Sequence, residues 1–450
     1  SEARFWNEVA TNECLRPLRE QHGENFHAFL REKIVPIDGD VGKPNCGVDA
    51  KLVAELNGTI DAVVNVAGVV DFNPPLDEAL DANAFGSKNL VDLARALGDV
   101  PLYHTSTCYT AGRRKELVFE EDPKNRPFPR VGELGAELWD PDREIADCLD
   151  LIEQANHRCD DAFRQSEFQE KARKNLLSRS EPTEGPAYDE ELKKVRRKFV
   201  SDWLVKAGIE RAEHWGWPNT YTYTKSIGEQ VVARSGLPFT IVRPACCEST
   251  SEFPFRGWNE GISTSVPIIF LTMQGQVRIP STDTVLDFIP SDMVCAGMVL
   301  ALAELIEGTQ KPVYQLGVSD VNPCSAARFG EMIGLYKRKH YQRTGKGNPF
   351  ANFIKAYTET MVVSQEAFER TGSRAIARTA RTMAQVMKRV PSLRPTAKGL
   401  ETYASTEQRI AEIMELFLPF MHDGVGPFSC NNTRMAYSRC SDEDKAKLPW

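Results

Sequence analysis

The stretch that decides the fold is Ile-Asp-Ala-Val-Val-Asn-Val-Ala-Gly at residues 60–68, where a β-branched apolar run leads directly into small residues. Similar apolar runs, which we expect to be strands, occur at residues 33–37, 100–105, 238–242 and 313–316. Longer helical patterns separate them at residues 76–97, 220–234 and 291–305, the last with a Ser or Asp as its expected cap. Strands that alternate with helices predict βαβ units, and therefore an α/β fold with a parallel sheet covered on both faces.

The composition is that of an ordinary globular chain, with 450 residues, 41% hydrophobic and 26% charged, and a net charge of −8. These values exclude a collagen-like, disulfide-scaffold or wholly disordered protein, and the mild acidity predicts no nucleic-acid partner. The most apolar run, residues 266–273, is far shorter than the ~18 residues that a membrane span needs. The eleven cysteines form no CxxC pair and the N-terminus lacks a secretory signal, so we expect a cytoplasmic protein with reduced thiols.

Residues 113–217 interrupt the alternation of strands and helices. Two highly charged helical patterns, at residues 143–180 and 189–214, predict an inserted helical hairpin whose charged faces are mainly solvated. After residue 322 the patterns are mainly helical, as at residues 325–341 and 405–417. The expected parts are a partial sheet domain at 1–112, the insertion at 113–217, the rest of the sheet domain with a substrate-binding region at 218–322, and a helical C-terminal domain at 323–450.

The segment 374–398 is basic although the chain as a whole is acidic. It holds seven Lys and Arg residues, no Asp or Glu, and an apolar stripe. We expect an amphipathic helix with a solvated basic face. The alternative is a surface that binds anionic groups: the phosphates of CoA, an acyl carrier protein or a lipid surface.

The strongest chemical signal is Asn-Thr-Tyr-Thr-Tyr-Thr-Lys at residues 219–225. Tyr221 and Lys225 are four positions apart, which places them on one face of a helix, one turn apart. An ammonium beside a phenol lowers the phenol pKa, and such a Tyr can give a proton to a carbonyl oxygen. Ser106 and Thr107 place hydroxyls after another predicted strand, at the sheet edge where α/β proteins bind ligands. The pattern predicts a carbonyl-reducing site; a Tyr-Lys pair on the surface is the alternative.

Together these segments resemble the extended short-chain dehydrogenase/reductase superfamily. Within it, the chain looks like an alcohol-forming fatty acyl-CoA reductase, and the segments that carry this resemblance are residues 70–76, 83–86, 106–107, 219–225, 287–293 and 416–450. The resemblance covers nearly the whole chain except the insertion. It implies a Rossmann-like, doubly wound parallel sheet followed by a mainly helical C-terminal domain.

The resemblance also implies a role for each site residue. Tyr221 would protonate the carbonyl oxygen as hydride arrives, Lys225 would lower the Tyr221 pKa and bind the nicotinamide ribose, and Thr107 would polarise the carbonyl. The implied cofactor is NADPH. The residues expected to line its site are Asp40, Val41, Ala67, Gly68, Asn83, Ser106, Tyr221, Lys225, Pro244 and Ala245. Of these, Asp40 would bind the adenine end, and Asn83 is a candidate member of a proton relay.

One feature of the family has no counterpart in the chain. The family begins with a strand and a glycine-rich turn that holds the pyrophosphate, whereas Ser1 corresponds to a point after the family's second strand. We therefore expect a sheet without its first strands, an N-terminally truncated sequence, and a function that is that of the parent protein. A protein that has lost its cofactor site is the less favoured alternative.

The predicted function is the NADPH-dependent reduction of a long-chain fatty acyl-CoA to the fatty alcohol by way of the aldehyde. The alternatives are a reductase that takes its acyl group from an acyl carrier protein or stops at the aldehyde, a nucleotide-sugar or sterol enzyme of the same superfamily, and a non-catalytic scaffold. A covalent acyl-enzyme at Cys108 is a less favoured route. The seven His are isolated, which predicts no metal site, and no GxSxG motif supports a hydrolase.

Overall fold

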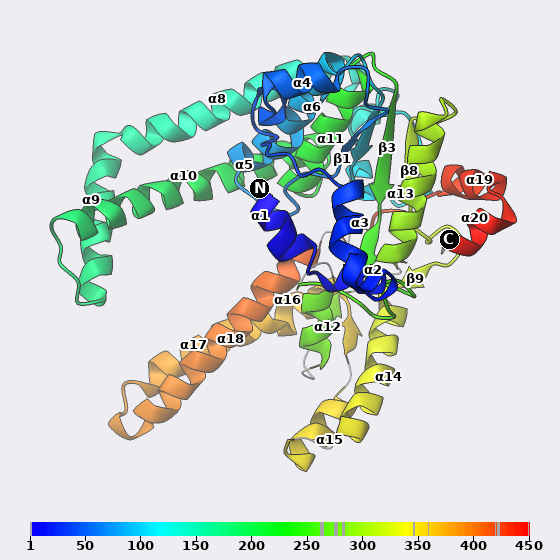
Figure 1. The fold of residues 1–450 in the computed structure, drawn as a ribbon. Coiled ribbons are helices and arrows are strands. Elements are labelled where there is room, and N and C mark those ends of the chain that lie inside the picture. The colour runs from blue at the N-terminus through cyan, green and yellow to red at the C-terminus, as the bar shows by residue number, and fades with distance from the viewer. Residues whose placement is uncertain are drawn as a thin grey trace.

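The computed structural model describes residues 2–261, 265–273, 278–280, 284–344, 347–358, 360–418, 420, 424–448 and 450. Its centre is a four-stranded parallel sheet in the order β1-β2-β3-β8 (Figure 1). The strands are β1 (Val63–Asn65), β2 (Leu102–Thr105), β3 (Phe239–Pro244) and β8 (Val313–Leu316). Four of the five predicted strands are confirmed, and with them the parallel α/β class.

Helices cover both faces of this sheet. The covering helices are α6 (Gly86–Ala96) and α11 (Thr220–Ala233) on one face, and α13 (Ser291–Ile306) and α19 (Asn431–Arg439) on the other. Because successive strand residues face opposite sides, β3 supplies both cores. Ile241 packs with Val91 and Val232 beneath α6 and α11, while Val242 packs with Tyr314 and Leu300 beneath α13. This three-layer arrangement is the predicted doubly wound one.

Residues 33–37 do not form the predicted strand. Helix α3 (Phe26–Lys33) runs up to this segment, and Ile34 continues in an extended conformation with φ −130° and ψ 124°. Among the described residues no strand pairs with this segment, and its Val35 is 79% exposed. The outer edge of β1 also has no neighbouring strand among them, and its Val64 is 44% exposed. A strand needs a neighbour for its N–H and C=O groups, so an apolar pattern alone does not make one.

The insertion is helical, as predicted, but its inner end is buried. Its helices are α7 (Val131–Leu134), α8 (Pro141–Asp160), α9 (Ala162–Ser178) and α10 (Pro186–Trp215). Figure 1 shows α8 and α10 running together away from the sheet, with α9 at the far end. The sequence predicts α8 and α9 as one helix; they are two because Asp161 leaves the helical conformation, and its carboxylate accepts a hydrogen bond from Phe163 N at 2.8 Å.

The remaining elements connect or extend this frame. They are α1 (Glu2–Arg4), α2 (Arg16–His22), α4 (Ala50–Leu56), α5 (Leu76–Leu80), α12 (Val266–Met273), and the short strand pairs β4 (Cys246–Glu248) with β7 (Phe288–Pro290), β5 (Arg278–Pro280) with β10 (Met361–Val363), and β6 (Val285–Leu286) with β9 (Cys324–Ser325).

The predicted helix 76–97 is a continuous run of α5, the π-helical turn η5 (Asp81–Phe85) and α6. The predicted Ser or Asp cap of α13 is wrong, because Pro290 precedes the helix and the Asp292 carboxylate instead accepts hydrogen bonds from the backbone of residues 251–253.

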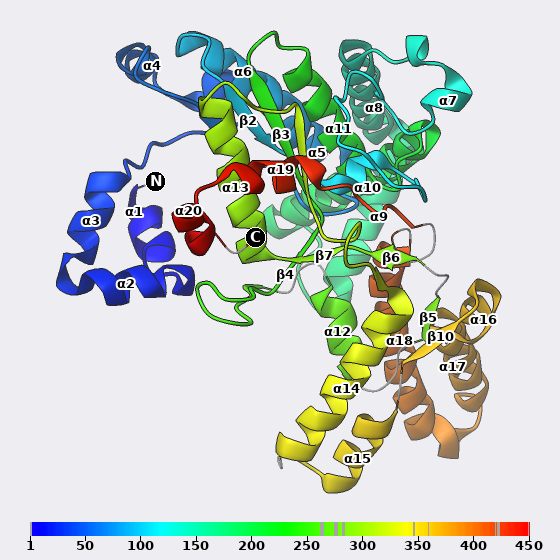
Figure 2. The same ribbon diagram turned by 90° about the vertical axis from the view of Figure 1, so that its right-hand side faces the viewer.

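The C-terminal region contains two helical hairpins. They are α14 (Ala326–Thr344) with α15 (Pro349–Tyr357), and α17 (Ser373–Met387) with α18 (Arg394–Leu418), preceded by α16 (Gln365–Thr371). Figures 1 and 2 show both hairpins extending from the same end of the molecule, away from the sheet. The single basic helix expected over 374–398 is divided, because the turn η8 (Pro391–Leu393) separates α17 from α18.

The last part of the chain returns to the sheet domain. The Thr433 hydroxyl donates to Gln315 O at 3.1 Å, and α20 (Asp442–Lys447) follows α19 beside α13 (Figure 2). Residues 419, 421–423 and 449 of the segment 416–450 lie outside the described residues. The four predicted divisions of the chain stay a prediction, but α19 and α20 belong with the sheet in space. No described helix is both long and apolar enough to cross a bilayer.

A buried ion pair ties α11 to the sheet. Arg243 at the end of β3 donates to both oxygens of Glu229 on α11, at 2.8 and 2.6 Å, and the two side chains are only 10% and 1% exposed. One position earlier, Gly228 allows α11 to approach η5 closely, because a Cβ there would lie 2.4 Å from Asn83 O. The pair and the glycine together determine where α11 lies on the sheet.

We expect Arg243→Met to destabilise the protein by about 3–5 kcal/mol, because it leaves the Glu229 carboxylate buried without its counter-ion. Urea unfolding measures this loss. The double variant Glu229→Leu with Arg243→Met should regain most of it, since no unpaired charge then remains. A single variant as stable as the original chain would contradict the assignment.

Candidate active site

The N-terminus of α11 positions the predicted tyrosine. The Asn219 side chain accepts a hydrogen bond from Thr222 N at 2.9 Å, which caps the helix and places Tyr221 in its first turn. Tyr221 N donates to Phe72 O at 3.2 Å. Because Tyr221, Lys225 and Glu229 follow at intervals of four, they share the face of α11 whose far end is tied to β3.

The turn after β2 brings the predicted threonine to the same place. Thr107 caps the short helix η6 (Cys108–Ala111) by accepting a hydrogen bond from Tyr109 N at 3.3 Å. Its hydroxyl lies 3.4 Å from Pro244 O and is hydrogen-bonded to the Tyr221 side chain. Three elements therefore meet at one point: the start of α11, the turn after β2 and the end of β3. Ala245 continues from Pro244 and donates its N–H to Leu316 O at 2.8 Å.

Burial controls the protonation of both α11 side chains. It raises the pKa of Tyr221 to about 12, against which the hydrogen bond with Thr107 acts in the opposite direction. Burial also lowers the pKa of Lys225 to about 8, with the Glu229 carboxylate acting against that shift. The predicted lowering of the Tyr221 pKa by Lys225 is therefore wrong: burial raises this pKa, and Lys225 is not among the groups that shift it. At neutral pH Tyr221 is a phenol with a proton to give.

A narrow cradle lies beside Lys225. Its ammonium donates to Thr105 O at 2.7 Å, and a Cβ added to Gly68 would lie 3.4 Å from that ammonium and 2.9 Å from Asn83 Oδ1. Asn83 is held in turn by Val69 N at 3.3 Å and by its own bond to Thr224 Oγ1 at 3.0 Å. A side chain at position 68 would therefore have to displace the Asn83 amide.

The cradle suits the nicotinamide and ribose end of a dinucleotide. Ala67 and Gly68 are exposed there, so a ligand can lie against the backbone. Ser106 Oγ is buried and has no hydrogen-bond partner among the described residues. An orphaned hydroxyl and a lysine ammonium are the donors that ribose hydroxyls and a carboxamide need. The predicted residues Ala67, Gly68, Asn83 and Ser106 thus fit the group for which they are expected.

Asp40 and Val41 lie apart from the Tyr221 cluster. Asp40 Oδ1 accepts a hydrogen bond from Gly42 N at 3.0 Å, and Val41 O accepts one from Asn89 Nδ2 at 2.8 Å. Both residues line a recess of about 250 Å³ together with Val53 and Leu93. The structure therefore places these two predicted cofactor residues against α6, in a separate hollow.

Cys108 is unsuited to the alternative covalent route. Its side chain is fully buried, and Sγ lies 2.9 Å from Arg243 O. Burial raises the pKa of this thiol well above its ordinary value, so it stays protonated and is a poor nucleophile.

Sequence reasoning missed the residues that hold α11 from its other side. On the insertion, Arg211 donates to both oxygens of Glu144 at 2.6 and 2.7 Å, and Trp215 Nε1 donates to the same carboxylate at 2.9 Å. The Tyr223 hydroxyl, two residues from Tyr221, completes the set by donating to Glu144. Arg243 could have been identified from the sequence, because a charged residue in a buried apolar strand requires a buried partner. Glu144 carries no such signal within its charged surroundings.

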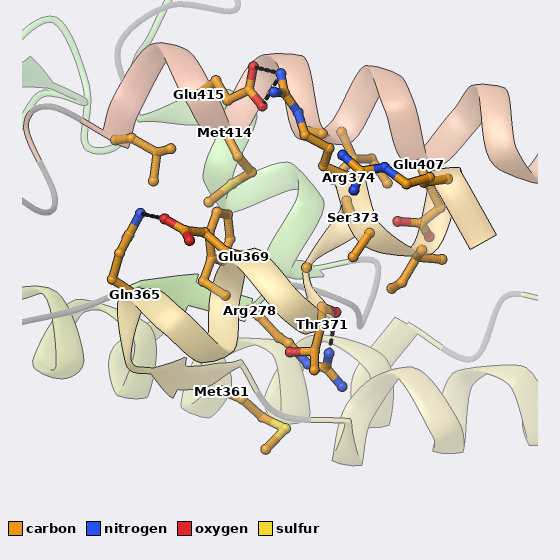
Figure 3. A pocket seen from close by; sticks show the side chains of 18 of the residues that line it. Arg278, Met361, Gln365, Glu369, Thr371, Ser373, Arg374, Glu407, Met414 and Glu415 are labelled. Carbon is orange, nitrogen blue, oxygen red and sulfur yellow. Dashed lines mark hydrogen bonds and ion pairs between the residues drawn. The ribbon is translucent and has the colours of Figure 1, made fainter. Parts of the chain in front are cut away.

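A larger cavity lies between α16, α17 and α18, with a volume of about 800 Å³. Figure 3 shows its mixed lining, with Met414 and Met361 among charged groups such as Arg278, and Arg374 paired with Glu415 at 2.5 Å. A recess of about 310 Å³ shares Arg374 and Arg378 with this cavity and adds Arg381.

The end of α18 joins the cavity to the Tyr221 cluster. Leu418 lines the cavity, and the ring of its neighbour Phe417 lies 5.7 Å from the ring of Phe72. Phe72 in turn accepts the hydrogen bond of Tyr221 N. One end of the cavity therefore lies next to the cluster, although none of the cluster residues lines it.

Comparison with known proteins shows the family to which the sequence is related. The NAD-binding family described as male sterility protein matches residues 1–298. The chain is 30% identical over 345 residues to the alcohol-forming fatty acyl-CoA reductase of Simmondsia chinensis, covering 75% of the chain and 62% of that protein. It is 28% identical over 359 residues to the chloroplastic fatty acyl-CoA reductase 2 of Arabidopsis thaliana, covering 77% of the chain and 52% of that protein. The chain thus spans less than two thirds of these relatives.

Among solved structures, the chain is similar to the terminal R domain from the myxalamid PKS-NRPS biosynthetic pathway. The identity is 17%, the alignment covers 91% of the chain and 70% of that structure, and the TM-score is 0.46.

The buried Lys225 predicts a specific pH dependence of stability. Its folded-state pKa of about 8 lies below the ordinary value of 10.5, so the unfolded chain binds this proton more tightly. Between those pH values, the free energy of unfolding should rise with pH by up to about 3 kcal/mol relative to Lys225→Met. Urea unfolding of both proteins across pH 7–11 measures the difference, with the exposed Lys193→Met on α10 as the control. Parallel curves for the chain and Lys225→Met would refute it.

Proposed function

Because the chain belongs to the male sterility family of NAD-binding proteins, we propose that it is an oxidoreductase that reduces a long-chain fatty acyl-CoA to the fatty alcohol with NADPH. The observation that carries the proposal is the protonated Tyr221 phenol, hydrogen-bonded to Thr107 and one helical turn from Lys225 beside the Gly68 cradle. The names of the two relatives, both fatty acyl-CoA reductases, support the substrate class.

The side chains of the cluster match what reduction of a carbonyl requires. Lys225 and Ser106 would hold the nicotinamide end of the cofactor beside Gly68, where it would supply the hydride. The Tyr221 and Thr107 hydroxyls donate hydrogen bonds to the carbonyl oxygen and stabilise the negative charge that develops there. Lys225 donates one hydrogen to Thr105 O and would hold the ribose through the others. Asn83 keeps the loop at Val69 in place through its amide oxygen.

Two reductions lead from thioester to alcohol. In the first, a hydride from one NADPH would add to the carbonyl carbon while Tyr221 hydrogen-bonds the oxygen; the C–S bond breaks, the thiolate leaves and takes a proton from solvent, and the aldehyde remains for a second NADPH. In the second, hydride adds to the aldehyde carbon and Tyr221 gives its proton to the oxygen. A phenol with a pKa of about 12 remains protonated at neutral pH, which suits this second step.

The cavity beside α18 is our proposed site for the CoA arm. Its lining mixes charged and apolar side chains, and it adjoins the recess of Arg378 and Arg381, for which the described residues provide no carboxylate partner. Gln408 on α18 lines the same recess as these two α17 arginines, and it is ten residues, or roughly 15 Å, from Leu418 along α18. A pantetheine arm spans this distance, so phosphates at the arginines leave the thioester next to Phe72 and Tyr221.

Two finer points belong to the same proposal. We propose the cytoplasm as the compartment; a plastid, which the name of the Arabidopsis relative specifies, is the alternative. A product that stops at the aldehyde, or an acyl carrier protein as the donor, is the alternative for the reaction. Identification of the product from palmitoyl-CoA, and comparison of the two donors, distinguishes among them.

Removing the proposed acid should abolish turnover. We expect Tyr221→Phe to lower kcat for palmitoyl-CoA and for hexadecanal by roughly 100-fold or more, because both reductions use its hydroxyl. Oxidation of NADPH, with NADH in parallel, measures the rate, and Tyr188→Phe on α10 is the matched control. Equal rates for the Tyr221 variant and the control would remove Tyr221 from the mechanism.

The proposed phosphate contacts predict a donor-specific defect. We expect Arg378→Glu with Arg381→Glu to raise KM for palmitoyl-CoA about tenfold or more. KM for S-palmitoyl-N-acetylcysteamine, a thioester without phosphates, should stay unchanged. Comparable increases for both thioesters, or for neither, would place the CoA arm elsewhere.

A further inference from the structure

Helix α15 presents an apolar face to solvent. Phe350, Phe353, Ile354 and Tyr357 follow at helical positions i, i+3, i+4 and i+7, and all four side chains are exposed, Phe350 by 72% and Phe353 by 61%. The helix faces the rest of the protein with Ala356, which is buried. An aromatic stripe this exposed is unusual for a surface helix, since apolar patches of this kind mark contact sites.

The tip of the α17–α18 hairpin has the same character. Met383, Val386 and Val390 are exposed at positions i, i+3 and i+7, and Leu393 is exposed in the turn that follows. The small residues Ala377, Ala380 and Ala384 form the buried side of α17 against α18. The larger apolar side chains are therefore the ones that face solvent.

Basic residues surround both apolar tips. Residues 332–400 contain fourteen Lys and Arg residues against three Glu, in a chain whose net charge is −8. Lys339 and Arg343 lie on the outer half of α14, and Arg389 and Arg394 lie at the α17–α18 turn, all four exposed. The described residues offer none of these four a salt bridge. Their charge is therefore available to an external partner.

The two tips point to the same side of the molecule. Figures 1 and 2, which differ by a quarter turn about the vertical axis, both show the hairpins projecting beyond the sheet domain in the same direction. Their inner ends are fixed: the buried Lys337 on α14 donates to Thr272 O at 3.1 Å, and Arg374 on α17 pairs with Glu415 on α18. A flat partner can touch both tips at once.

We propose that these two hairpin tips dock the protein on the surface of an anionic lipid bilayer. Exposed aromatic and aliphatic side chains enter the region between headgroups and acyl chains, and the surrounding Lys and Arg attract anionic headgroups. A bilayer provides both partners across an extended plane, which two separate tips require. The basic surround also disfavours a second copy of the same face, because like charges would meet. The proposal does not depend on the reaction that the chain catalyses.

Vesicle sedimentation tests this docking surface. We expect the chain to bind vesicles of phosphatidylcholine with phosphatidylserine, to bind pure phosphatidylcholine far less, and to be released by added salt. Phe350→Ser with Phe353→Ser should lower the partition coefficient about tenfold or more, and Arg389→Glu with Arg394→Glu should do the same while removing the preference for phosphatidylserine.

Matched changes on the insertion serve as controls. Phe163 on α9 is 70% exposed, and Lys193 and Arg197 are exposed on α10, so Phe163→Ser and the double reversal Lys193→Glu with Arg197→Glu should bind as the original chain does. All changed side chains are exposed, and circular dichroism checks that each variant is folded. Absence of vesicle binding, or equal binding by tip and control variants, overturns the proposal. Dimerisation that the Phe350 and Phe353 changes abolish, without vesicle binding, would assign the surface to a second copy instead.

Discussion

Helix α11 is held by buried charge on both of its sides. Toward the sheet, Glu229 pairs with Arg243; toward the insertion, Tyr223 joins the carboxylate of Glu144, which Arg211 neutralises. A charge is tolerated in the interior only where its partner is correctly placed. Each contact therefore fixes the rotation of α11 about its own axis and its position along that axis. Tyr221 and Lys225 inherit their positions from these two contacts, and their own surroundings shift their pKa values only because α11 keeps them buried.

Local sequence patterns predict the strands and helices of the sheet domain better than they predict the burial and charge around individual side chains. Four strands and α11 follow from local patterns, and the meeting of Tyr221, Thr107 and Gly68 follows from where those elements end. The segment 33–37 shows the limit, since its pattern indicates apolar character but says nothing about a neighbouring strand. The pKa of Tyr221 shows a second limit. The spacing predicts a lysine one helical turn away, whereas the direction of the pKa shift follows from the burial of the phenol. Glu144 could not be found, because its partners lie 67 and 79 positions away along the chain.

Charge is divided unevenly between the parts of the molecule. The basic residues of the two C-terminal hairpins contrast with the acidic remainder of the chain. The arginines of α17 and of the turn after it have different surroundings at successive positions. Arg374 forms an ion pair with Glu415 near the end of α18 that lies beside Phe72. Arg378 and Arg381 line a recess midway along the hairpin, and Arg389 is exposed at the turn. A helix pair can thus combine a structural ion pair, a ligand recess and an outer surface at successive turns.

The insertion contains two hydrophobic clusters, one at its base beside α11 and one at its far end. The cluster at the base includes Trp139, Trp215 and Tyr223, whereas the distal cluster of Phe168, Ala172 and Val195 involves α8, α9 and α10 alone. The loop after α9, at residues 179–185, is mostly exposed and lies at the far end of the insertion, away from α11 and the sheet (Figure 1). A reporter protein spliced into that loop would leave the helix that carries Tyr221 undisturbed, so the arm offers a natural attachment point for a label.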